Sequence, residues 1–173
     1  MTREFENIGE SLLNKARKIR LVITDCDGVL TDNGVYYDNQ GEAMKRFSIR
    51  DGMGVERLRN LHGVETGIMT GETSGSVVKR AEKLKISHLY LGIKDKKAKL
   101  AEVLEETGLS AEEIAFIGDD TNDLEIMGEV GFTACPGDAT IFAQKAAAYI
   151  CRERGGNGAF RELAELIILS KQT

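Results

Sequence analysis

Two acidic clusters stand directly after short apolar runs of the sequence. Asp25 and Asp27 follow the run Leu-Val-Ile-Thr, and Asp119 and Asp123 follow the run Ile-Ala-Phe-Ile, with one glycine between. Because the carboxyl ends of parallel strands meet at one edge of a sheet, these carboxylates are expected to line one pocket. Carboxylates so placed can hold Mg²⁺, attack phosphorus and move a proton. The pattern therefore indicates metal-assisted phosphoryl transfer.

Two hydrogen-bond donors follow other predicted strands. Thr70 ends the run Gly-Ile-Met-Thr, and Lys96 stands a few residues after the run His-Leu-Tyr-Leu. Such donors stabilise the non-bridging phosphate oxygens, where transition-state charge lies. Further lysines surround Lys96, so Lys94 stays open as the alternative, and a run of lysines is also typical of a solvated helix face. Each element alone is weaker than the ordered set.

Helical and strand patterns alternate along the chain, which predicts an α/β fold with a central parallel sheet. The expected helices are Phe5–Ile19, Gly52–Leu61, Gly75–Leu84, Asp95–Glu106, Leu124–Glu129, one between the last two strands, and one ending near Leu169. The expected strands are Arg20–Thr24, Glu65–Met69, His88–Leu91, Ile114–Ile117, Gly131–Ala134 and Ala148–Cys151.

Two segments lie outside this alternation. Gly34–Tyr37 and Glu42–Phe47 flank a four-residue turn, which predicts a β-hairpin over about residues 33–48. Near the end, a glycine-rich segment precedes an apolar helix, together about residues 154–170. A chain of 173 residues has room for one substantial core, so we expect a single domain spanning 1–173.

Composition excludes several classes of function. The chain carries 28 acidic and 23 basic residues, a formal net charge of −5, which argues against a nucleic-acid partner. No run approaches the ~18 apolar residues of a membrane span and the start is charged, so we expect a cytoplasmic protein without a membrane partner. The three cysteines, far apart, suggest free thiols.

In order and spacing, these motifs resemble the haloacid dehalogenase (HAD) superfamily of phosphatases. The resemblance implies a three-layer HAD-like sandwich with Mg²⁺ as the cofactor. It implies that Asp25 is nucleophile and metal ligand, that Asp27 is acid/base and offers a carbonyl to the metal, and that Asp119 completes the metal site. The implied phosphoryl-binding residues are Thr70, Gly71 and Lys96, with Asp123 as a support behind them.

The chain has no room for the cap domain that most HAD phosphatases carry, so another subunit is expected to cover the pocket. The segments Asp-Asn-Gly-Val-Tyr-Tyr, Phe-Ser-Ile-Arg-Asp-Gly-Met-Gly and Arg-Gly-Gly-Asn-Gly-Ala-Phe-Arg-Glu resemble the capless branch that includes 3-deoxy-D-manno-octulosonate 8-phosphate (Kdo8P) phosphatases. That branch implies a sugar-acid phosphate substrate and a homotetramer with hairpins at its centre. Arg50 and Arg161 would then contact the sugar acid, although Arg161 equally suits a helix salt bridge.

Three alternatives stay open. The substrate could be a nine-carbon sugar acid phosphate, 2-keto-3-deoxynononate or N-acetylneuraminate 9-phosphate, which the motifs do not distinguish from Kdo8P. A phospho-acceptor receiver domain would use Asp51, Thr70 and Lys96, but it would leave the second acidic cluster without a role. A scaffold without activity is disfavoured by the intact set of motif residues.

Overall fold

A six-stranded parallel sheet forms the middle layer of the structure, a computed structural model that describes residues 8–172. The strand order is β5-β4-β1-β6-β7-β8, and every pair in this sheet runs parallel. The predicted α/β class with a central parallel sheet is therefore confirmed. The strands are β1 Leu21–Thr24, β4 Glu65–Met69, β5 His88–Tyr90, β6 Ile114–Ile117, β7 Phe132–Cys135 and β8 Tyr149–Ile150.

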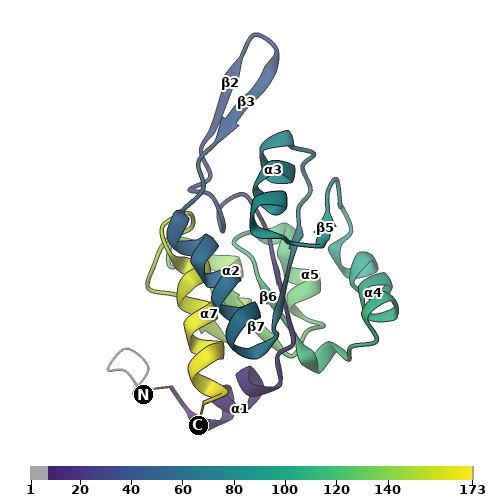
Figure 1. Cartoon of the computed structure of the whole chain (residues 1–173), viewed down its shortest axis with the longest axis vertical. Coiled ribbons are helices and arrows are strands. Elements are labelled where there is room, and N and C mark those ends of the chain that lie inside the picture. The colour runs from purple at the N-terminus through teal and green to yellow at the C-terminus, as the bar shows by residue number, and fades with distance from the viewer. Residues whose placement is uncertain (1–7, 173) are drawn as a thin grey trace.

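Helices cover both faces of the sheet (Figure 1). On one face α1, α2, α3 and α7 share a core with the side chains of Val22, Ile68 and Phe132. On the other face α4 and α5 pack on Ile23 and Phe116, and α6 packs beside them on Cys135. The helices are α1 Glu10–Lys18, α2 Ile49–His62, α3 Gly75–Leu84, α4 Lys96–Thr107, α5 Leu124–Met127, α6 Ile141–Ala146 and α7 Ala159–Ser170.

The strand order reverses beside β1. The chain moves outward from β1 to β4 and β5 on one side, and to β6, β7 and β8 on the other. In open α/β sheets the crevice at such a point, outside the carboxyl ends of the strands, is where ligands bind. The loops after β1 and β6 flank this crevice and carry the two acidic clusters.

A separate two-stranded hairpin follows the first acidic loop and projects from the body (Figure 1). It consists of β2 Val35–Asp38 and β3 Gly41–Lys45, paired antiparallel with an irregularity after Tyr36. Tyr36, Tyr37 and Met44 leave most of their surface exposed. The described residues include no separate cap over the sheet, as predicted.

The main differences from the predicted elements lie at helix starts. α2 begins at Ile49 rather than at Gly52, because the hydroxyl of Ser48 caps it by accepting the amide proton of Asp51 at 3.3 Å. Of the first predicted helix, Phe5 lies outside the described residues, and α1 begins at Glu10. No helix among residues 8–172 combines the length and apolar character needed to cross a bilayer.

Asp51 joins α2 to α7 instead of capping its own helix. Its carboxylate is 2% exposed and accepts the amides of Gly158 at 3.2 Å and Arg161 at 2.9 Å, two donors at the start of α7. Gly155 and Gly156, which precede α7, pack against the first acidic loop. The amide of Gly156 donates to the Val29 carbonyl at 2.8 Å. A Cβ at Gly155 would lie 1.9 Å from the Gly28 carbonyl oxygen. The loop thus rests on this segment.

Replacing Asp51 with Ala is expected to destabilise the fold by about 2 kcal/mol, because two buried amides lose their acceptor. Urea unfolding followed by circular dichroism measures this. Asp38→Ala, in the exposed hairpin turn, is the control and should change the free energy of unfolding by less than about 0.5 kcal/mol. Equal values for the two variants would contradict this role for Asp51.

Candidate active site

Asp25 lies at the carboxyl end of β1, at the switch point of the sheet. Its amide donates to the Ile117 carbonyl at 2.9 Å, which extends the β1–β6 ladder by one step, and its Oδ1 accepts the amide of Cys26 at 2.7 Å. The side chain is 7% exposed. The ladder and the amide together fix a buried carboxylate that faces the crevice.

Asp123 organises the second acidic loop. Its Oδ2 accepts the amides of Asp119 at 2.9 Å and Asp120 at 3.3 Å, which folds the loop back on itself. Its Oδ1 accepts the Lys96 ammonium at 2.6 Å. Both oxygens of Asp123 are therefore engaged. Within residues 8–172, the carboxylate of Asp119 accepts one hydrogen bond, from Asn33 Nδ2 at 3.3 Å.

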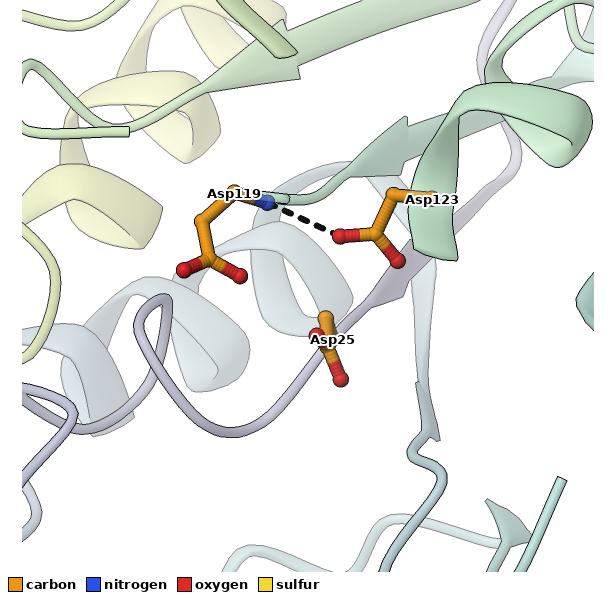
Figure 2. Close-up of side chains that lie close together, drawn as sticks. All are labelled: Asp25, Asp119 and Asp123. Atoms are coloured by element: carbon orange, nitrogen blue, oxygen red, sulfur yellow. Dashed lines mark hydrogen bonds between the residues drawn. The ribbon is translucent and has the colours of Figure 1, made fainter. Parts of the chain in front are cut away.

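The carboxylates of Asp25, Asp119 and Asp123 converge (Figure 2), each offering an oxygen within 4.8 Å of the others, and all three residues are buried. Hard oxygen ligands at this spacing suit Mg²⁺. Because Asp123 already holds two amides and an ammonium, Asp25 and Asp119 are the better candidates for direct ligands. This set of residues fits a divalent cation.

Electrostatics point to the same cation. Burial, with the charge of Asp25 and then that of Asp123 beside it, raises the pKa of Asp119 to about 7. Burial and the charge of Asp123 also raise the pKa of Asp25, although the Lys96 ammonium opposes this. The folded protein thus carries carboxylates that repel one another when ionised, and a bound cation relieves the repulsion.

Lys96 lies at the buried base of the site, where its ammonium contacts two of the clustered carboxylates. It is the first residue of α4, which Asp95 caps by accepting the Ala98 amide at 2.8 Å. Its ammonium reaches Asp25 Oδ1 at 3.1 Å in addition to Asp123, and its side chain is 2% exposed. Lys94, the alternative, is exposed and donates to the Gly71 carbonyl at 2.8 Å. Lys96 is thus the lysine in contact with Asp25.

A cavity of about 310 Å³ opens above these carboxylates. Thr70, at the end of β4, is fixed by its amide, which donates to the Tyr90 carbonyl at 3.0 Å. The volume lies at the small end of the range typical of ligand sites. The lining residues are Asp25, Asp27, Asn33, Thr70, Gly71, Glu72, Ile93, Lys94, Asp119, Asp120 and Asn122.

Lys45 is a neighbour of this site that sequence reasoning missed. It ends β3 of the hairpin, and its ammonium lies 2.7 Å from Oδ1 and 2.6 Å from Oδ2 of Asp27. Burial lowers the pKa of Lys45, but the hydrogen bond and charge of Asp27 outweigh burial and leave this pKa above its ordinary value. The sequence offered only a weak signal for this contact. Lys45 lies on a strand that was predicted from its extended run and its turn, and nothing in that pattern marks a buried lysine.

The structure places Arg50 and Arg161 away from the acidic cluster. Within one chain both line a separate pocket of about 170 Å³ beside Glu162 and Glu165. Arg161 Nε donates to Glu165 at 2.7 Å, an ion pair between residues four apart on one helix. The predicted contacts of these arginines with a substrate stay predictions.

The geometry disfavours the receiver-domain alternative. Asp51 accepts its hydrogen bonds from the start of α7, and it does not line the cavity that holds Thr70. Lys96 contacts Asp25 and Asp123 rather than Asp51. The three residues required by that reading therefore do not share a site.

Comparison with known proteins decides the family. The model of the haloacid dehalogenase-like hydrolases matches residues 92–163. The 3-deoxy-D-manno-octulosonate 8-phosphate phosphatase KdsC of Yersinia pestis is 37% identical over 164 residues, which cover 95% of this chain and 87% of that protein. The chain belongs to the KdsC family of HAD phosphatases.

Solved KdsC-family structures share the whole fold. The Kdo8P phosphatase of Moraxella catarrhalis, in complex with magnesium, phosphate and KDO, has a TM-score of 0.90 and 34% identity, and the match covers 94% of this chain and 92% of that one. The cobalt-bound enzyme of Haemophilus influenzae has a TM-score of 0.89 and 35% identity, covering 91% and 92% of the two chains. Divalent metals thus accompany this fold in its relatives.

The free energy of unfolding should rise with falling pH in the metal-free protein and fall with falling pH in the presence of Mg²⁺. Because the pKa values of Asp25 and Asp119 are higher in the folded than in the unfolded chain, the folded state binds more protons. The free energy of unfolding of metal-free protein should therefore rise as pH falls from about 8 to about 5. Saturating Mg²⁺ competes with those protons and should reverse the trend.

Thermal unfolding across this range, with and without Mg²⁺, measures the effect. Asp119→Asn is the matched variant, and it should flatten the dependence on pH of the metal-free protein. Metal-free wild-type protein that loses stability as pH falls through this window would contradict the interpretation.

Proposed function

We propose that this protein is a Mg²⁺-dependent Kdo8P phosphatase that acts through a phospho-aspartyl intermediate on Asp25, with the whole chain 1–173 working as one domain. One observation carries the proposal: Asp25 and Asp119, from loops far apart in sequence, offer oxygens to one cation site in a chain of the KdsC family. When bound, Mg²⁺ neutralises the charge that would otherwise repel a phosphate from these carboxylates.

The first half-reaction transfers the phosphoryl group to the chain. A carboxylate oxygen of Asp25 forms a bond to phosphorus, and the bond from phosphorus to the ester oxygen breaks. Asp27 gives its carboxyl proton to that leaving oxygen. Thr70, the Gly71 amide and Lys96 are assigned to the phosphoryl oxygens; Lys96, which contacts Asp25, also keeps the nucleophile ionised.

The second half-reaction returns the enzyme to its starting state. Water attacks phosphorus, Asp27 takes the proton of that water, and the bond between phosphorus and Asp25 breaks, which releases inorganic phosphate. Asp27, in addition, offers its backbone carbonyl to the metal in this assignment. Asp123 is assigned a supporting role, because its two oxygens accept the loop amides and the Lys96 ammonium.

The KdsC relatives support Kdo8P as the substrate, in the biosynthesis of lipopolysaccharide. Such a substrate carries a phosphate at one end and a carboxylate at the other, so it needs a second cationic contact. Arg50 is assigned to that carboxylate from a neighbouring subunit, with Arg161 beside it, because within one chain both lie in the separate pocket. The protein is proposed to act in the cytoplasm.

Release of phosphate from Kdo8P tests the function. Wild-type protein with Mg²⁺ should turn over continuously, and chelation should abolish the activity. Asp25→Asn should lower kcat by at least about 10⁴-fold, because the nucleophile is lost. Asp38→Asn, on the hairpin turn, serves as the control and should retain activity. A preference of more than tenfold for a nine-carbon sugar acid phosphate would replace Kdo8P as the substrate, and labelling that stops after one phosphate would overturn the hydrolase.

We propose that four copies assemble through their hairpins. The exposed Tyr36, Tyr37 and Met44 supply apolar surface for this contact, and Ile49 next to the hairpin is 81% exposed. The open cavity of one chain gains a cover from its neighbour in this arrangement. Sedimentation equilibrium should give a tetramer for wild-type protein and smaller species for a Tyr37→Asp, Met44→Asp double variant; a monomeric wild-type protein would refute the assembly.

A further inference from the structure

The ammonium of Lys45 is buried at the base of the hairpin, against the carboxylate assigned to proton transfer. It contacts both oxygens of Asp27, at 2.7 and 2.6 Å, and its side chain is 1% exposed, compared with 22% for Asp27. Lys45 does not line the cavity, whereas Asp27 does. Contact between Lys45 and a bound substrate is therefore expected to be indirect, through Asp27.

Lys45 has a second acidic partner, Glu42. Glu42 Oε2, on the same strand, lies 3.5 Å from its ammonium, and the hydroxyl of Ser74 donates to Glu42 Oε1. Ser74 is the N-cap of α3 and accepts the amide of Val77 at 3.5 Å. A continuous chain of polar contacts thus runs from Asp27 through the hairpin to a helix of the main body.

Stability alone does not explain such an arrangement. Removing an ammonium from water costs as much as, or more than, the ion pair returns, so a buried lysine is a poor source of folding free energy. An ammonium centred between both oxygens does, however, restrain the direction in which a carboxylate points. Thr31 adds a weaker contact, its hydroxyl lying 3.4 Å from Asp27 Oδ1. Orientation of Asp27 is what these contacts supply.

We propose that Lys45 is a positioning residue that holds the Asp27 carboxyl in line with the leaving oxygen of the substrate. The proposal rests on the proposed function, since it gives Asp27 the transfer of one proton to the ester oxygen as the bond from phosphorus to that oxygen breaks. Because Lys45 belongs to β3, the hairpin assigned to assembly also aligns the acid–base group.

The basicity of the leaving group separates positioning from a merely structural role. A sugar alkoxide must be protonated as it leaves, whereas the nitrophenolate of p-nitrophenyl phosphate leaves without a proton. Lys45→Met should therefore lower kcat for Kdo8P by about 100-fold, with KM little changed, and should lower kcat for the aryl ester far less. Lys45→Arg, which keeps a positive charge at this place, should recover part of the loss.

Lys79→Met is the matched control: Lys79 pairs with Glu82 on the exposed face of α3, and neither rate should change. Equal losses of kcat for the two esters in a folded Lys45→Met protein would overturn the proposal. Should that variant fail to fold, Glu42→Gln decides in the same way, because it removes the group behind Lys45. It should lower the ratio of the two rates in the same direction, and an unchanged ratio overturns the proposal.

The assay of wild-type protein distinguishes failure of the Lys45 proposal from failure of the proposed hydrolase activity. Wild-type protein that releases no phosphate from either ester with Mg²⁺ would overturn the hydrolase and the role of Lys45 together. Wild-type protein that turns over both esters, beside a Lys45→Met variant with an unchanged ratio of rates, would leave the hydrolase standing and refute only the positioning role.

Discussion

The carboxylates of Asp25, Asp119 and Asp123 repel one another, and the surrounding structure must offset this repulsion. Oxygens of three buried carboxylates within 4.8 Å cannot all stay ionised without cations nearby. The chain supplies one of them, Lys96, and arranges backbone amides around Asp123. The repulsion that remains between Asp25 and Asp119 fits a site for Mg²⁺. The crevice at the reversal of strand order brings these residues from separate loops to one point.

Much of this arrangement could be predicted because the relevant signals are local. Asp25, Thr70 and Asp119 each follow a short apolar run, and in a parallel sheet that position alone places them at a common edge. The choice of Lys96 over Lys94 was harder, since both stand in one run of lysines. It depends on where α4 begins: Asp95 caps the helix, so Lys96 starts it and points inward.

Other features depend on contacts between distant segments, which periodicity does not report. The predicted start of α2 at Gly52 was wrong, because Ser48 caps the helix and the carboxylate of Asp51 accepts an amide at the start of α7. Lys45 was missed because a lysine on a short hairpin strand is ordinarily solvated. It is buried here because it ends β3 at the base of the hairpin, where its ammonium contacts Asp27. Arg50, predicted to contact the substrate, lies within one chain in a pocket separate from the acidic cluster, and no local sequence signal reports that separation.

The seating of the first acidic loop on Gly155 and Gly156 has a consequence for biosynthesis. Asp25 is synthesised early, but the glycines that contact its loop, and helix α7 that follows them, are synthesised only after the last strand of the sheet. A nascent chain can therefore contain the acidic residues before their loop has the packing contacts that fix its conformation.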